Sequence, residues 1–159
     1  MTRQPYPLES LLKLRDDRVQ AHAQSLATQL ARGQAAETTL RGREQARREH
    51  ARAVAEIVAL ERERLARGEL SGADLLRSAE FQRGARVQAE ILQRTEQEAR
   101  AALASEREKE RLLREQLARS EADAKLVKNH AGDFREKQAD QALRSEEEAA
   151  LEQWNARRN

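Results

Sequence analysis

The segment Arg67-Gly68-Glu69-Leu70-Ser71-Gly72-Ala73-Asp74 contains the one convincing helix break in the chain. A glycine just past the last helical residue commonly ends a helix, because glycine adopts left-handed backbone angles without strain. Ser71 and Asp74 have the spacing of a capping box, in which side chains bind the free backbone N–H groups of a new helix. Because the connection is so short, we expect the two flanking helices to run antiparallel.

The first helix is expected to begin near Pro7. A proline cannot lie in a helix interior but suits the first helical position, where its missing N–H costs nothing. We therefore predict a first helix over about residues 7–67, a turn at 68–71 and a second helix over about 72–154. Together they would form a single hairpin over residues 1–159, in which the longer second helix overhangs or bends.

Apolar residues of the first segment repeat in heptads, as in coiled coils. One heptad position holds Leu12, Val19, Leu26, Leu40 and Val54, and the position four residues later holds Ala23, Leu30, Ala51, Val58 and Leu65. The pattern weakens between Gly33 and Arg47, where we expect the softest part of this helix. A seam this narrow suits one partner helix, so the sequence predicts an all-α, long antiparallel two-helix coiled coil.

Composition supports an exposed helical fold. The chain has 159 residues, of which 36% are charged and only 3% are aromatic, and it contains 6 Gly and 2 Pro. Scarce β-branched residues argue against a sheet, and scarce aromatic residues argue against a thick core. Acid–base pairs four residues apart, such as Glu44/Arg48 and Glu96/Arg100, each stabilise a helix by about 0.2–0.5 kcal/mol.

Location is predicted from what the sequence lacks. It has no cysteine, which suits a reducing cytoplasm and excludes disulfides and thiolate metal sites. No apolar stretch approaches the roughly 20 residues that span a bilayer, and the N-terminus lacks the apolar core of a signal peptide. We expect a cytoplasmic protein without direct membrane insertion.

Residue patterns that carry catalysis are missing as well. His22, His50 and His130 are far apart and lack metal-ligand spacing, so we interpret each as a surface or seam-edge residue. The sequence contains no phosphate-binding loop, dinucleotide fingerprint or nucleophile elbow. Solvated acids such as Glu146–Glu148 do not form a general acid–base pair. We predict no catalytic, cofactor-binding or metal site, and therefore no enzyme.

Nucleic acid is not an expected partner. The net charge is only +2, and acidic residues interrupt the basic cluster of Arg41, Arg43, Arg47, Arg48 and Arg52. No aromatic residues alternate with these arginines to stack on bases. A solvated helix face explains the cluster better.

The few aromatic residues are candidates for protein contacts. Phe134 lies within the apolar stripe of the second helix, so we predict that it packs. Tyr6 and Trp154, expected together at the terminal end, and Phe81, near the turn, either pack or form exposed anchors for a partner.

Residues 6–15, YPLESLLKLR, resemble the start of the FliJ/YscO proteins of bacterial type III secretion, where a short lead precedes an L-x-x-L-L-x-L-R pattern. Gly68, followed by Leu70, Leu75, Leu76 and Phe81, is similar to the glycine-then-aromatic midsection of that family. The tail, with Arg144, Glu146–Glu148, Leu151 and a basic end at Arg157-Arg158, is similar to its acidic C-terminal pattern. In length and layout the likeness covers nearly the whole chain.

The resemblance implies a function. FliJ/YscO proteins are antiparallel coiled coils in the pore of the hexameric secretion ATPase; they promote its assembly and activity and link it to the export gate, and some hold export chaperones. The implied ATPase-binding residues are Leu8, Leu11, Leu12, Leu14, Arg15 and Trp154. The implied contacts with the cytoplasmic domain of the gate are Leu75, Leu76 and Phe81. This places the protein peripherally at the inner-membrane base of the secretion apparatus.

Two questions stay open at the level of sequence. The machine is either flagellar or an injectisome, and the few aromatics near the turn favour the injectisome. The alternative function is a generic coiled-coil scaffold or tether that self-associates through its apolar stripe.

Overall fold

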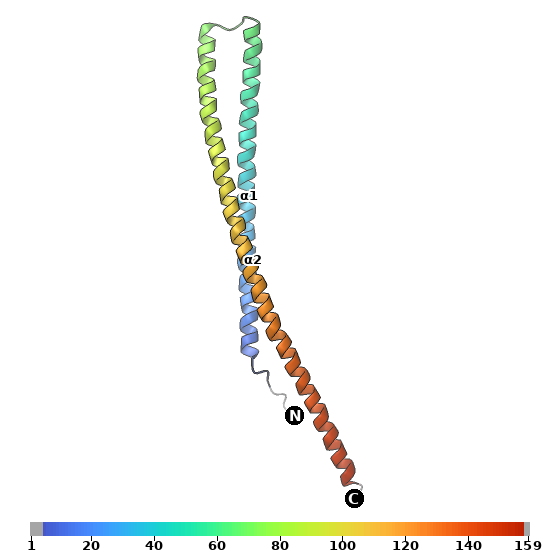
Figure 1. The fold of residues 1–159 in the computed structure, drawn as a ribbon. Coiled ribbons are helices and arrows are strands. Elements are labelled where there is room, and N and C mark those ends of the chain that lie inside the picture. Colours follow the sequence, from blue (N-terminus) through green and yellow to red (C-terminus); the bar gives the residue numbers. More distant parts are fainter. Residues whose placement is uncertain (1–4, 158–159) are drawn as a thin grey trace. The chain divides into compact units, whose positions relative to one another are not determined.

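The computed structural model describes residues 5–157 and consists of two α-helices, α1 (Glu9–Ala66) and α2 (Gly72–Ala156) (Figure 1). The helices pack against each other as an antiparallel α-hairpin, which confirms the predicted all-α fold and the position of its turn. Arg158, part of the basic end noted in the sequence, lies outside the described residues.

The helix ends differ slightly from the prediction. α1 begins at Glu9 rather than at Pro7, because Leu8 accepts the first helical hydrogen bond, from the Leu12 N–H at 2.9 Å. Pro7 and Leu8 form a preceding turn, in which the Glu9 N–H donates to the Tyr6 carbonyl at 3.2 Å. α2 continues two residues past Trp154.

The end of α1 is a Schellman motif centred on Gly68. The Glu69 N–H donates to the Arg64 carbonyl and the Gly68 N–H to the Leu65 carbonyl, both at 3.0 Å. Gly68 has a φ of 69°, the left-handed conformation that this motif requires. Two otherwise unpaired carbonyls of α1 are thereby satisfied.

The start of α2 is the predicted capping box. Ser71 precedes the helix, and the Asp74 N–H donates to its Oγ at 3.3 Å. In return the Ser71 backbone N–H donates to Asp74 Oδ2 at 2.9 Å, and the Ser71 hydroxyl donates to the same oxygen at 2.6 Å. These hydrogen bonds, first that of the hydroxyl, lower the pKa of Asp74 below its ordinary value.

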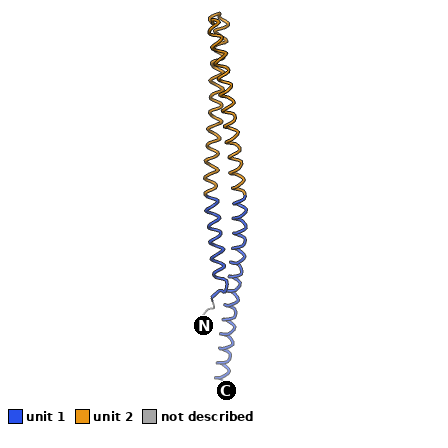
Figure 2. Tube along the Cα trace, turned by 90° about the vertical axis from the view of Figure 1, so that its left-hand side faces the viewer, with its two compact units in different colours: residues 1–27, 112–159 blue, residues 28–111 orange. Residues whose placement is uncertain are grey.

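The chain divides into two compact units (Figure 2). We call residues 1–27 with 112–159 the terminal unit, and residues 28–111, which include the turn, the turn unit. Each unit pairs one segment of α1 with one segment of α2.

The seam between the helices is more polar than predicted. The first predicted row points inward, since Leu12, Val19, Leu26, Leu40 and Val54 are all half-buried. In the second row, however, Ala23, Ala51 and Leu65 are exposed, so the prediction for these three was wrong. Four residues that lie three positions after the first heptad position point inward instead, namely Arg15, His22, Gln29 and His50, whereas Arg43 and Ile57 of the same row are exposed. These polar side chains are tolerated because they find partners on the other side of the seam.

The core is thin. Among the described residues the buried hydrophobic ones are Tyr6, Leu103, Ala124 and Ala131, and no side chain is completely enclosed. The accessible surface is 12693 Å², whereas a compact monomer of this mass would expose roughly 8,000 Å². Many large hydrophobic side chains remain exposed, among them Leu60, Leu76 and Leu126. Within the described part of the chain, no helix is long and apolar enough to cross a membrane.

Candidate protein-binding surfaces

The predicted ATPase-binding residues all lie in the terminal unit, but they differ in availability. Leu8 and Leu14 are exposed, Leu14 to 49%. Leu11 and Leu12 are half-buried, and Leu12 belongs to the seam. A partner could reach Leu8 and Leu14 without opening the hairpin.

Arg15 is held against α2. Its Nη1 donates to Asp123 Oδ2 at 2.7 Å, while its Nε is buried without a hydrogen-bond partner. A second ion pair, between Lys128 and Asp16 at 2.8 Å, lies beside it in sequence. Arg15 therefore joins the two helices of the terminal unit, and binding a partner through this guanidinium would compete with that pair.

Tyr6 packs rather than forming an exposed anchor. It is 7% exposed, and its hydroxyl shares a hydrogen bond of 2.8 Å with His130 Nδ1. Its ring lies 5.5 Å from the ring of Phe134, measured between centroids, so the predicted packing of Phe134 is confirmed. This cluster holds the segment that precedes α1 against α2.

Trp154 is 57% exposed and does not lie beside Tyr6, contrary to expectation. Tyr6 contacts Phe134, which precedes Trp154 by twenty residues of continuous helix, a distance of roughly 30 Å at 1.5 Å per residue. All residues from Glu146 to Arg157 are exposed. The end of α2 thus presents Leu151 and Trp154 next to an acidic run.

The predicted gate-binding residues lie in the turn unit, and all three are exposed. They do not form one stripe, because positions five or six residues apart on a helix point in different directions. Leu76, the most exposed at 70%, and Phe81 therefore belong to different faces of α2. A single flat partner could not cover both.

A buried ionic group joins the helices of the turn unit. Glu96 is buried and accepts hydrogen bonds from Arg47 Nε at 2.5 Å and Arg100 Nη2 at 2.9 Å. Arg100 also pairs with Glu44 at 3.1 Å. The sequence pattern predicted the Glu96/Arg100 pair within one helix, but it missed the contact of Glu96 with Arg47 of α1, which lies 49 positions away.

Gln29 is a second buried polar residue of the seam. Its amide donates to the backbone carbonyl of Glu106 at 3.0 Å and to the carboxylate of the same residue at 2.5 Å. Hydrogen bonds, first from Lys109 and then from Gln29, lower the pKa of Glu106. Groups that must find particular partners disfavour shifted alignments of two helices, which apolar contacts alone would tolerate.

Each of the three histidines forms a hydrogen bond that joins α2 to α1 or to the segment before α1. His22 Nδ1 shares a hydrogen bond of 2.6 Å with the Ser120 hydroxyl, and His50 Nε2 donates to the Ala85 carbonyl at 3.0 Å. His130 holds Tyr6, as described above. Among residues 5–157, no three His, Cys, Asp or Glu side chains are grouped to hold a metal ion.

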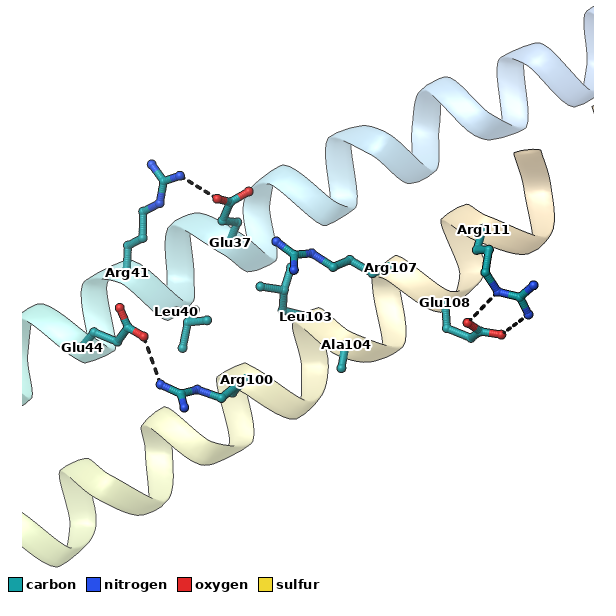
Figure 3. Close-up of a pocket in the computed structure, with 10 residues that line it drawn as sticks. All are labelled: Glu37, Leu40, Arg41, Glu44, Arg100, Leu103, Ala104, Arg107, Glu108 and Arg111. Carbon is teal, nitrogen blue, oxygen red and sulfur yellow. Dashed lines mark hydrogen bonds and ion pairs between the residues drawn. The ribbon is translucent and has the colours of Figure 1, made fainter. Parts of the chain in front are cut away.

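An open groove of about 680 Å³ lies between α1 and α2 in the turn unit (Figure 3). Its apolar lining consists of Leu40, Leu103 and Ala104. Most arginines at its rim are paired with neighbouring acids, in the pairs Arg41–Glu37, Arg100–Glu44 and Arg111–Glu108. The last pair lowers the pKa of Glu108. Because the rim neutralises its own charges, the groove does not concentrate charge of one sign.

Comparisons with protein-family models, curated proteins and solved structures find no match for this chain. The resemblance of residues 6–15, residues 68–81 and the tail to FliJ/YscO proteins stays a prediction from the sequence.

Proposed function

We propose that this protein is a non-enzymatic stalk subunit of a type III secretion export apparatus. It binds the hexameric secretion ATPase, promotes its assembly and activity, and links it to the cytoplasmic domain of the export gate. The proposal is carried by one observation. The structure is an antiparallel hairpin in which Leu8, just before α1, and Leu14, in its first turns, are exposed within the FliJ/YscO-like segment.

The geometry supports a binding role through its exposed apolar side chains. Leu8, Leu14 and Trp154 can each bury surface against a partner at a gain of about 25 cal/mol per Å². A two-helix hairpin has no rotational symmetry about its long axis, so it makes different contacts with successive subunits of a surrounding ring. Such differences bias the conformational equilibrium of each subunit and hence the order of hydrolysis.

Under this proposal the protein acts at the cytoplasmic side of the inner membrane. Leu75, Leu76 and Phe81 are its candidate contacts with the gate, and export chaperones are further partners. Because Leu76 and Phe81 lie on different faces, the gate would have to surround the turn rather than cover one side of it.

The experiment mixes the purified protein with a type III secretion ATPase from the same organism, and measures ATP turnover and ATPase oligomerisation. The wild-type chain should raise both. Leu14→Arg should remove the effect while leaving the hairpin folded, because Leu14 lies outside the seam. Leu126→Arg is the matched control: Leu126 is 69% exposed, lies in the same unit and is not a predicted ATPase contact.

Two results would count against the stalk. One is unchanged turnover and oligomerisation with the wild-type chain. The other is equal loss of stimulation in both variants, which would show that the predicted terminal contacts carry no specificity.

A second candidate function is a coiled-coil scaffold or tether that self-associates. It is favoured by the thin core and by the many large hydrophobic residues that remain exposed. A scaffold would leave ATP turnover unchanged, so the same assay separates the two functions.

A further inference from the structure

One face of the turn unit is free of charged residues. On α1 it consists of Ala46, His50, Ala53, Ile57 and Leu60, and on α2 of Phe81, Gly84, Gln88, Ile91 and Thr95. Ala46, His50 and Thr95 are half-buried at the border with the seam, and the other seven are exposed. Within each helix the spacing alternates between three and four residues, so each set forms one stripe. We call these ten positions the uncharged face; they are notable in a chain that is 36% charged.

Both stripes lie on the same side of the helix pair. On α1, Ala53, Ile57 and Leu60 each immediately precede a half-buried seam residue, and on α2 Phe81, Gly84 and Ile91 do the same. Two antiparallel helices are related by a two-fold axis perpendicular to the plane that contains both helices. A half-turn about this axis exchanges the helices, but the front of the pair stays in front and the back stays at the back. Equivalent positions of the two helices therefore share one side.

Contacts across the seam bring the stripes level with each other. The Ser78 hydroxyl donates to Glu61 at 2.5 Å, and His50 donates to the Ala85 carbonyl at 3.0 Å. This alignment places Phe81 across from Ile57 and Leu60, and all three are exposed. They form an apolar cluster near one end of the face, and Ile91 extends the apolar surface toward the other end.

The opposite side of the same helices is charged. The residues that immediately follow the seam positions there include Arg62, Arg83 and Arg86, together with the uncharged Ala55 and Ala59. Both sides belong to the same hairpin, so a general need for solubility would place charged residues on both of them. The difference points to a partner on the uncharged side alone.

The size of the face matches a small protein interface. It extends over fifteen residues of each helix, 46–60 and 81–95, or roughly 20 Å. With two helices about 8–10 Å apart, it offers roughly 500 Å² per copy. Two such faces would bury roughly 1,000 Å² in total, the lower bound for a specific interface.

We propose that the uncharged face binds the same face of a second copy, so that two turn units form a four-helix assembly. A charged surface could not cover this face without losing hydration for its own charges. A second copy supplies a surface of matching length and chemistry, and a symmetric dimer uses one patch twice. Because the area is at the lower bound, the dimer is reversible, with a dissociation constant in the micromolar range.

The test is sedimentation equilibrium of the full chain from roughly 1 to 200 µM, a range that brackets the expected dissociation constant. The weight-average mass should rise from 18.1 kDa toward twice that value. Leu60→Arg places a charge on the face, where Leu60 is 61% exposed, and should weaken association about tenfold or more. Leu76→Arg changes a similarly exposed leucine outside the face and should leave association unchanged.

A second pair of variants repeats the comparison at other positions, in case one of the leucine variants misfolds. Ala53 lies at the middle of the α1 stripe, whereas Ala59 is also exposed but lies outside it, so Ala59→Arg is the control for Ala53→Arg. Circular dichroism should show wild-type helix content for all four variants. A chain that stays monomeric throughout the range, or variants outside the face that weaken association as much as those on it, would overturn the proposal.

The dimer assigns a surface to self-association, the second candidate function, and does not depend on binding to the ATPase. Phe81 is also a candidate gate contact, so a second copy and the gate would compete for this side chain. The uncharged face lies within residues 46–95, whereas the predicted ATPase contacts lie in the terminal unit. Leu60→Arg should therefore stimulate the ATPase as the wild-type chain does. If the wild-type chain fails to stimulate the ATPase, the stalk function is contradicted; if it fails to associate, the dimer is contradicted. The two failures are separate results.

Discussion

Replacing Gly68 by alanine should destabilise the hairpin through the backbone alone. Gly68 has a φ of 69°, and a Cβ added there would meet no heavy atom within 4 Å. The substitution therefore creates no clash, and its cost is the strain of placing an L-residue in the left-handed region. That strain is about 1–2 kcal/mol.

The unfolded chain offsets part of this strain. Alanine restricts the unfolded state more than glycine does, which favours folding by about 0.4–1 kcal/mol. We therefore expect Gly68→Ala to lower the free energy of unfolding by about 1 kcal/mol.

Gly42→Ala is the matched control, because it makes the same chemical change inside α1. A Cβ at Gly42 also meets nothing within 4 Å, but the backbone there is helical. Alanine should stabilise this position by about 0.5–1 kcal/mol. The two variants should thus differ by about 1.5–2 kcal/mol, with opposite signs relative to the wild type.

The assay is urea unfolding followed by the helical circular dichroism signal, at a protein concentration below the expected dimer range. The dependence of the unfolding free energy on urea should be the same for all three chains, because the area exposed on unfolding does not change. If Gly68→Ala proved as stable as the wild type, or if both variants gained stability equally, the left-handed turn would not be what ends α1.

Two further substitutions test the ends of the helices. Asp74→Asn should reduce the pH dependence of stability. Because the folded pKa of Asp74 is lowered, its carboxylate contributes to the free energy of unfolding at neutral pH, and this contribution is lost below roughly pH 4. Acid unfolding curves of variant and wild type should therefore differ there. Identical curves would exclude an electrostatic role for this cap. Tyr6→Phe should lower stability by only about 0.5–1.5 kcal/mol, since the ring keeps its contact with Phe134. Tyr6→Ala should release the segment before α1, measured as faster amide hydrogen exchange at Leu12; unchanged exchange would show that Tyr6 does not hold this segment.

The helix boundaries could be predicted from sequence because their causes are local. Gly68 and the Ser71/Asp74 pair act through hydrogen bonds to residues at most five positions away. Heptad spacing likewise identified the first row of the seam, since periodicity alone decides which residues share a helix face.

The polar part of the seam could not be predicted in this way. A pattern of apolar residues selected Ala23 and Ala51, whereas the structure buries Gln29 and half-buries His22. Whether a polar side chain can be buried depends on a partner across the seam, and those partners are 77 and 98 positions away. For the same reason the sequence left open whether Tyr6 packs, which depends on His130 and Phe134.

The sequence by itself therefore determined that the chain forms two helices joined by one tight turn, because capping, backbone strain and helix propensity are local properties. Only the tertiary structure decided which side of each helix faces the other. The uncharged face follows from that decision: Ile57 and Phe81 become neighbours only once the antiparallel alignment is set by contacts between residues distant in the chain.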